Sequence, residues 1–64
     1  MYDWTYLDET GAEVGRSDRF EDPEAAEEWI GVAWKDLAER GIEQVELIDR
    51  VRDRRVYRMG LEPE

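Results

Sequence analysis

Aromatic side chains occupy every second position of residues 2–7. A period of two with aromatic residues is typical of a β-strand. Four turn-forming residues follow, and the last of them, Gly11, is suited to a positive φ. A weaker apolar pattern at 12–16 predicts a return strand, so the chain is expected to open with a β-hairpin.

Residues 23–40 carry apolar side chains at spacings of three and four, which predicts an amphipathic helix. Asp22 is a favourable N-cap residue and Pro23 fits the first helical position. Gly41 is expected to end the helix in the left-handed conformation, with Ile42 packed over the helix end.

Two further strands are predicted at 44–49 and 54–59, joined by a turn at 50–53 that lacks both Gly and Pro. Residues 60–64 are expected to form a short C-terminal tail. These patterns predict one domain over 1–64, with the element order ββαββ.

The fold class expected from this order is α+β, a four-stranded sheet with one helix packed on one face. If the two hairpins meet through the first and last strands, those strands are central and parallel, as in a β-grasp. An antiparallel sheet with another strand order is the alternative, and the sequence does not separate the two.

The helix contains a tryptophan that does not fit its apolar stripe. Trp34 lies about 90° from the centre of the stripe, at 100° per residue, and is expected at its rim. With Trp29 and three strand aromatics, the core would be crowded, so either Trp34 is partly exposed or a strand aromatic faces outward. A partly exposed Trp34 is a candidate aromatic binding anchor, or else a lid on the edge of the core. Gly31, on the outer face of the helix, is a candidate for a small contact patch with Val32 and Lys35.

The chain resembles small, uncharacterised acidic proteins of actinobacteria. The residues that carry the resemblance lie in three of the predicted elements and one linker: Trp4, Tyr6, Leu7 and Asp8; Phe20; Ala26, Trp29, Trp34 and Leu37; and Val56, Tyr57 and Met59. The resemblance implies a small α+β domain and no catalytic or binding residue.

Composition removes several chemistries. The 64 residues include neither cysteine nor histidine. Thiolate and histidine zinc sites, Ser-His-Asp and Cys-His catalysis, and a histidine pH switch are therefore excluded. A domain this small has little room for a cleft in which paired carboxylates would act as acid and base. We expect a protein that is not an enzyme and needs no cofactor or metal.

Charge is strongly segregated within a formal net charge of −9. A candidate binding patch for carboxylates or phosphates is formed by Arg50, Arg52, Arg54, Arg55 and Arg58. In the alternative interpretation these arginines neutralise Glu43, Glu46 and Asp49 across the strands. A candidate acidic face is formed by Glu21, Glu24, Glu27 and Glu28. It is either a contact surface for a basic protein, an imitation of nucleic acid, or a solvated face.

The charge also limits the expected partners. Direct contact with nucleic acid or an anionic membrane is disfavoured, because phosphates are repelled by this surface. Neither a signal peptide nor a membrane-spanning segment is apparent, so a cytoplasmic location is expected. The favoured function is a small regulator or accessory subunit that binds another protein, with a homodimer as a further state. The alternative is an acidic nucleic-acid mimic that inhibits a nucleic-acid-binding protein.

Overall fold

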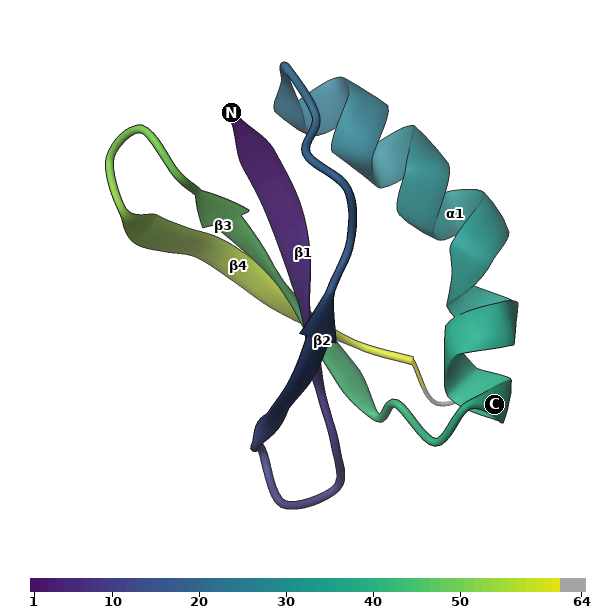
Figure 1. Cartoon of the computed structure of the whole chain (residues 1–64). Coiled ribbons are helices and arrows are strands. Elements are labelled where there is room, and N and C mark those ends of the chain that lie inside the picture. The colour runs from purple at the N-terminus through teal and green to yellow at the C-terminus, as the bar shows by residue number, and fades with distance from the viewer. Residues whose placement is uncertain (62–64) are drawn as a thin grey trace.

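Residues 1–61 fold into one helix and four strands in the order ββαββ (Figure 1). The computed structural model describes residues 1–61. The elements are β1 (Tyr2–Leu7), β2 (Glu13–Arg16), α1 (Pro23–Glu39), β3 (Gln44–Asp49) and β4 (Arg54–Gly60). Of the expected tail at 60–64, Gly60 belongs to β4 and Leu61 is buried in the core, while residues 62–64 lie outside the described part. Within residues 1–61, no helix has the length and apolar character needed to cross a membrane.

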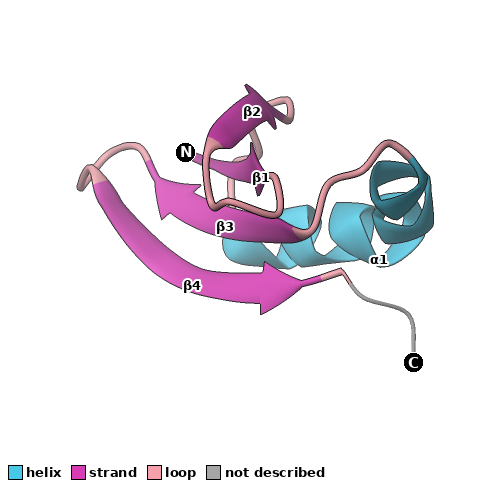
Figure 2. Cartoon of the chain, turned by 90° about the horizontal axis from the view of Figure 1, so that it is seen from below, coloured by secondary structure: helices cyan, strands magenta, loops and turns pink. Residues whose placement is uncertain are grey.

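The sheet is antiparallel throughout, with strand order β2-β1-β3-β4. Figure 2 shows β2 and β4 at its two margins. The β-grasp arrangement considered above is therefore wrong, because β1 pairs with β3 and not with β4. Burial explains the choice: Trp4 of β1 lies opposite Leu47 of β3, and both are fully buried, whereas β4 is mostly exposed.

Both ends of α1 are fixed as its sequence predicts. The Asp22 carboxylate caps the first turn by accepting the backbone N–H three residues further on, at 2.8 Å. Gly41 takes a φ of +88°, and its N–H donates to the Ala38 carbonyl at 3.1 Å. The Ile42 N–H reaches the Leu37 carbonyl at 3.2 Å. This pattern is a Schellman motif, which places Ile42 over the end of the helix.

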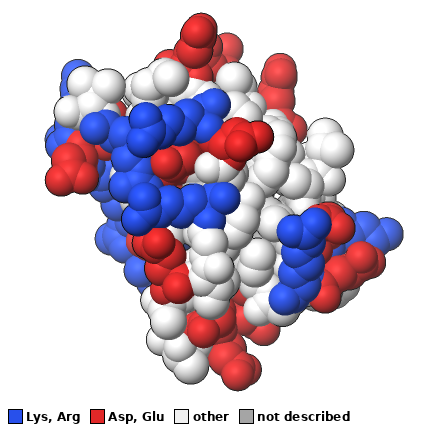
Figure 3. Space-filling model, viewed as in Figure 1, with Lys and Arg blue, Asp and Glu red and all other residues white. Residues whose placement is uncertain are grey.

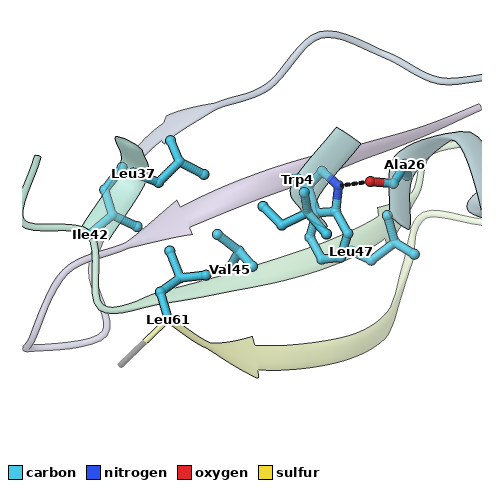
Figure 4. Packing of buried hydrophobic residues seen from close by; sticks show 8 residues of the cluster. Trp4, Ala26, Leu37, Ile42, Val45, Leu47 and Leu61 are labelled. Carbon is cyan, nitrogen blue, oxygen red and sulfur yellow. Dashed lines mark hydrogen bonds between the residues drawn. The ribbon is translucent and has the colours of Figure 1, made fainter. Parts of the chain in front are cut away.

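The core lies between α1 and one face of the sheet, called here the inner face (Figures 1 and 4). Trp4 is at its centre, and its indole N–H donates to the Ala26 carbonyl at 2.9 Å. Because that donor is buried, the bond both satisfies it and ties β1 to the start of α1. Leu61 extends the same cluster beyond the end of β4.

Candidate functional site

The five arginines of the candidate patch do not form one free surface. Arg50 turns onto the outer face of the sheet, where its guanidinium contacts the Asp3 carboxylate at 2.9–3.1 Å. The side chains are 23% and 5% exposed, so this ion pair is largely removed from water. The hydrogen bonds that Arg50 donates to Asp3 raise the pKa of Arg50, and the Thr5 hydroxyl accepts a further contact from the guanidinium at 3.4 Å. Arg50 is a structural residue of the outer face.

Arg55 and Arg58 share a single acid. Both guanidinium groups reach the same oxygen of Glu46, at 2.8 and 3.3 Å. The hydrogen bond from Arg55, reinforced by Arg58, lowers the pKa of the Glu46 carboxyl. Two positive charges, those of Arg55 and Arg58, face the single negative charge of Glu46. One positive charge is therefore left in excess on this part of the sheet. Figure 3 shows blue and red side chains next to one another on the side of the molecule away from α1.

The other two arginines lie near the turn between β3 and β4. The contact between the Arg52 guanidinium and the Asp49 carboxylate is long, at 3.9 Å. The Asp49 carboxylate mainly accepts hydrogen bonds from the backbone N–H groups of Val51 and Arg52. Arg54 is exposed at the start of β4. The cross-strand interpretation therefore describes Arg55 and Arg58, which contact Glu46. The weaker Arg52–Asp49 contact is local to the turn, and Asp3 is an unforeseen partner of Arg50.

The candidate acidic face is mostly open to solvent. Glu21, Glu24, Glu27 and Glu28 are all exposed. Glu27 differs from the other three because its carboxylate accepts the Tyr57 hydroxyl of β4 at 3.0 Å. Burial, followed by this hydrogen bond, raises the pKa of Tyr57. Glu27 therefore joins α1 to β4 across the surface of the molecule.

Beside this contact, an apolar groove of about 510 Å³ runs between α1 and β4. It is lined by Glu27, Ile30, Gly31, Trp34, Tyr57, Met59, Gly60 and Leu61. Trp34, the expected rim residue, is 38% exposed, so the first of the two alternatives for the crowded core is confirmed. Gly31 lies in the groove with Trp34, whereas Val32 is 85% exposed and does not line it. The two neighbours thus do not share one patch.

A second hollow, of about 550 Å³, lies at the end of β4 and shares Gly60 with the groove. Its lining is acidic and polar: Asp8, Glu9, Glu43, Gln44 and Gly60. The Asp8 carboxylate is already engaged by the Thr10 hydroxyl and two backbone N–H groups of its own turn, which lower its pKa. Within residues 1–61, no three acidic side chains are grouped so that they would hold a metal ion.

The sequence predicts Trp34 as a candidate anchor, but it does not predict the groove that Trp34 lines. Its strand side is formed by Tyr57 and Met59, which alternate with exposed positions along β4. The alternation is visible in the sequence, but only the strand order shows that this strand is an edge and that α1 leaves the two side chains partly uncovered. Chemically, the groove offers apolar contact and an open strand edge, without a nucleophile.

Comparison with protein-family models, curated proteins and solved structures finds no match to this chain.

Proposed function

We propose that this protein is a non-enzymatic, cytoplasmic interaction module that binds a partner protein in the groove between α1 and β4. The observation that carries the proposal is the partly exposed Trp34, facing a groove whose strand side is Tyr57 and Met59. Small monomeric domains seldom leave aromatic side chains around an apolar hollow unless the surface contacts something else.

The groove has the composition of a binding anchor. Trp and Tyr are enriched among residues that dominate binding energy, since each adds a large contact area around one polar group. Here the Tyr57 hydroxyl is held by Glu27, so the ring is fixed before a partner arrives. Such an ordered aromatic wall loses little side-chain entropy on binding.

The arginines give weaker support for a docking surface. Arg50, Arg55 and Arg58 already contact acids of the same chain. Exposed ion pairs contribute little, about 0–1 kcal/mol, and a partner would have to replace contacts that exist. We therefore assign the anchor to the groove, with the arginines as neighbours that influence which partner fits.

The proposal is tested by blocking the groove without disturbing the fold. Gly31 lines the groove, and nothing lies within 4 Å of a Cβ built there, so Gly31→Gln adds a side chain at the groove wall whose first atom meets no neighbour. The substitution also removes a helical glycine, which stabilises the helix by up to about 1 kcal/mol. Val32→Gln is the matched control, because it introduces the same side chain one position away and outside the groove.

Tagged wild-type protein and both variants are used to capture partners from native lysate at low and high salt, with mass spectrometry as the readout. We expect a protein retained at high salt by the wild type and by Val32→Gln, and lost by Gly31→Gln. A partner captured equally by the wild type and both variants would contradict the proposal. A partner that is captured only at low salt, and equally by the wild type and Gly31→Gln, would instead favour binding through the acidic surface and the mimicry of nucleic acid.

A further inference from the structure

Strand β4 presents an unpaired backbone edge directly beside the groove. It is the last strand of the sheet, and within residues 1–61 its only strand neighbour is β3. The Leu61 N–H donates to the Glu43 carbonyl of the chain preceding β3, at 3.0 Å. Because backbone groups alternate in direction along an antiparallel ladder, the N–H and carbonyl groups of Arg58 and Gly60 point to the open edge.

Side chains alternate along the same strand. Tyr57 and Met59 face the groove, whereas Arg58 reaches Glu46 on the outer face. A strand added to the edge of β4 would continue this alternation. Every second side chain would enter the groove toward Trp34, and the side chains between them would lie on the outer face beside Arg58.

The charge of β4 selects among possible occupants. The strand contains three arginines, Arg54, Arg55 and Arg58, and no acid. The only acid that Arg55 and Arg58 contact within residues 1–61 is Glu46, which leaves one positive charge unbalanced. Carboxylates on the outer side of an added strand would balance that charge, as opposite charges do across strands.

A second copy of this chain fits the edge poorly. If β4 paired with β4 of another copy, arginines would lie beside arginines on the same sheet face, and like charges there are destabilising. Each copy also carries a net charge of −9. The local charge therefore favours a different protein over self-association.

We propose that β4 accepts an extended segment of a partner protein in which apolar side chains alternate with acidic ones. The segment pairs with the backbone of Arg58 and Gly60, places its apolar side chains in the groove, and sets its carboxylates against the arginines. This inference rests on the proposed function, because it names the form of the partner that the groove binds.

Two substitutions at one position test the backbone pairing. Gly60→Pro removes an N–H that points to the open edge and not to β3, and proline is tolerated at such edge positions. Gly60→Ala keeps the N–H, and a Cβ at this position meets no atom within 4 Å. The probes are two synthetic peptides with blocked ends, one alternating valine with glutamate and the other alternating valine with lysine.

Titrations are followed by amide chemical shifts in ¹⁵N-labelled protein. We expect the valine–glutamate peptide to shift the amides of Arg58 and Gly60, with Gly60→Ala close to the wild type. Gly60→Pro should bind about tenfold more weakly, since it loses one backbone hydrogen bond. If Gly60→Pro does not fold, slowed hydrogen exchange of these two amides in the peptide-bound wild type is the supporting result, and unchanged exchange overturns the pairing.

The charge preference is tested separately by Arg58→Gln, which keeps the backbone N–H. Its affinity for the valine–glutamate peptide should fall by about two- to fivefold, as expected for an exposed ion pair. Tighter binding of the valine–lysine peptide by the wild type would overturn the acidic segment. A peptide affinity unaffected by Gly60→Pro, in a variant that folds, would overturn strand addition.

Failure of this inference and failure of the proposed function give different results. A protein partner that is lost by Gly31→Gln but retained by Gly60→Pro would leave the groove as the binding site and reject the added strand. A partner retained by Gly31→Gln would reject both. Concentration-dependent dimerisation of the wild type, abolished by Gly60→Pro, would identify a second copy as the occupant and overturn the acidic segment.

Discussion

The two sides of β4 differ in how many of their side chains have a partner within the same chain. On the outer face, Arg55 and Arg58 contact Glu46, and further across the sheet Arg50 contacts the buried Asp3. Toward α1, Trp34 remains partly exposed beside an apolar groove. The comparison suggests that charged residues here mainly secure the fold, whereas the uncovered aromatic and aliphatic residues are available for binding. Substitutions on the outer face should therefore change stability, whereas removal of the Tyr57 hydroxyl in the groove should change it little.

The largest expected effect is at the buried ion pair. Asp3→Asn removes the charge that Arg50 faces and leaves a guanidinium that is only 23% exposed without its partner. Breaking a fully buried pair costs about 3–5 kcal/mol, and the access of Arg50 to water reduces the expected loss to about 2 kcal/mol. Urea denaturation measures the change in the free energy of unfolding.

Arg50→Gln and the double variant complete a cycle that isolates the interaction between the two side chains. A single-variant loss below about 0.5 kcal/mol would show that the outer face does not depend on this pair. For a domain of this size, whose total stability is about 3–5 kcal/mol, the expected loss is a large share.

The sequence predicts where the helix and the strands lie along the chain, but not which strands pair with each other. Local signals sufficed for α1, because Asp22 and Gly41 determine its ends through contacts a few residues away. The turn before β4 lacks Gly and Pro. Its left-handed position is taken by Asp53, with a φ of 54°, and Asp adopts this conformation more readily than most residues. Strand order depends on contacts far apart in the chain, so the central place of β3 required the structure.

For the same reason, only part of the candidate site could be predicted from the sequence. Trp34 was identified because its angular position on the helix is a local property. The Asp3–Arg50 pair joins residues 47 positions apart, and no local spacing signals it. Likewise, Tyr57 and Met59 have the pattern of core residues, and their partial exposure follows from the edge position of β4.

An intermediate effect is expected from Glu46, and it depends on pH. The folded state lowers the pKa of this carboxyl, so at acidic pH the unfolded chain binds more protons than the folded one. The contribution of Glu46 is therefore complete above its unfolded pKa of about 4.3 and is lost as pH falls through the lower folded value. Glu46→Gln should cost about 1 kcal/mol at neutral pH, because two exposed arginines lose their shared acid.

Urea denaturation of the wild type and Glu46→Gln at several pH values checks this prediction. Seventeen other acidic residues also titrate, so the informative quantity is the difference between the two proteins. That difference should shrink as pH falls below about 4. A difference that stays constant from neutral to acidic pH would assign the effect to packing and not to charge.

The smallest effect is expected at Tyr57, on the groove side of β4. Tyr57→Phe keeps the ring that packs edge-on against Trp4, with centroids 5.8 Å apart, and removes only the hydroxyl that donates to Glu27. Because this hydrogen bond is exposed, its loss should change the free energy of unfolding by no more than about 0.5 kcal/mol. Partner or peptide binding should weaken more clearly, since the ring is then less firmly held at the wall of the groove. A stability loss above about 1.5 kcal/mol with unchanged binding would reverse the comparison and make this side of β4 part of the folding core.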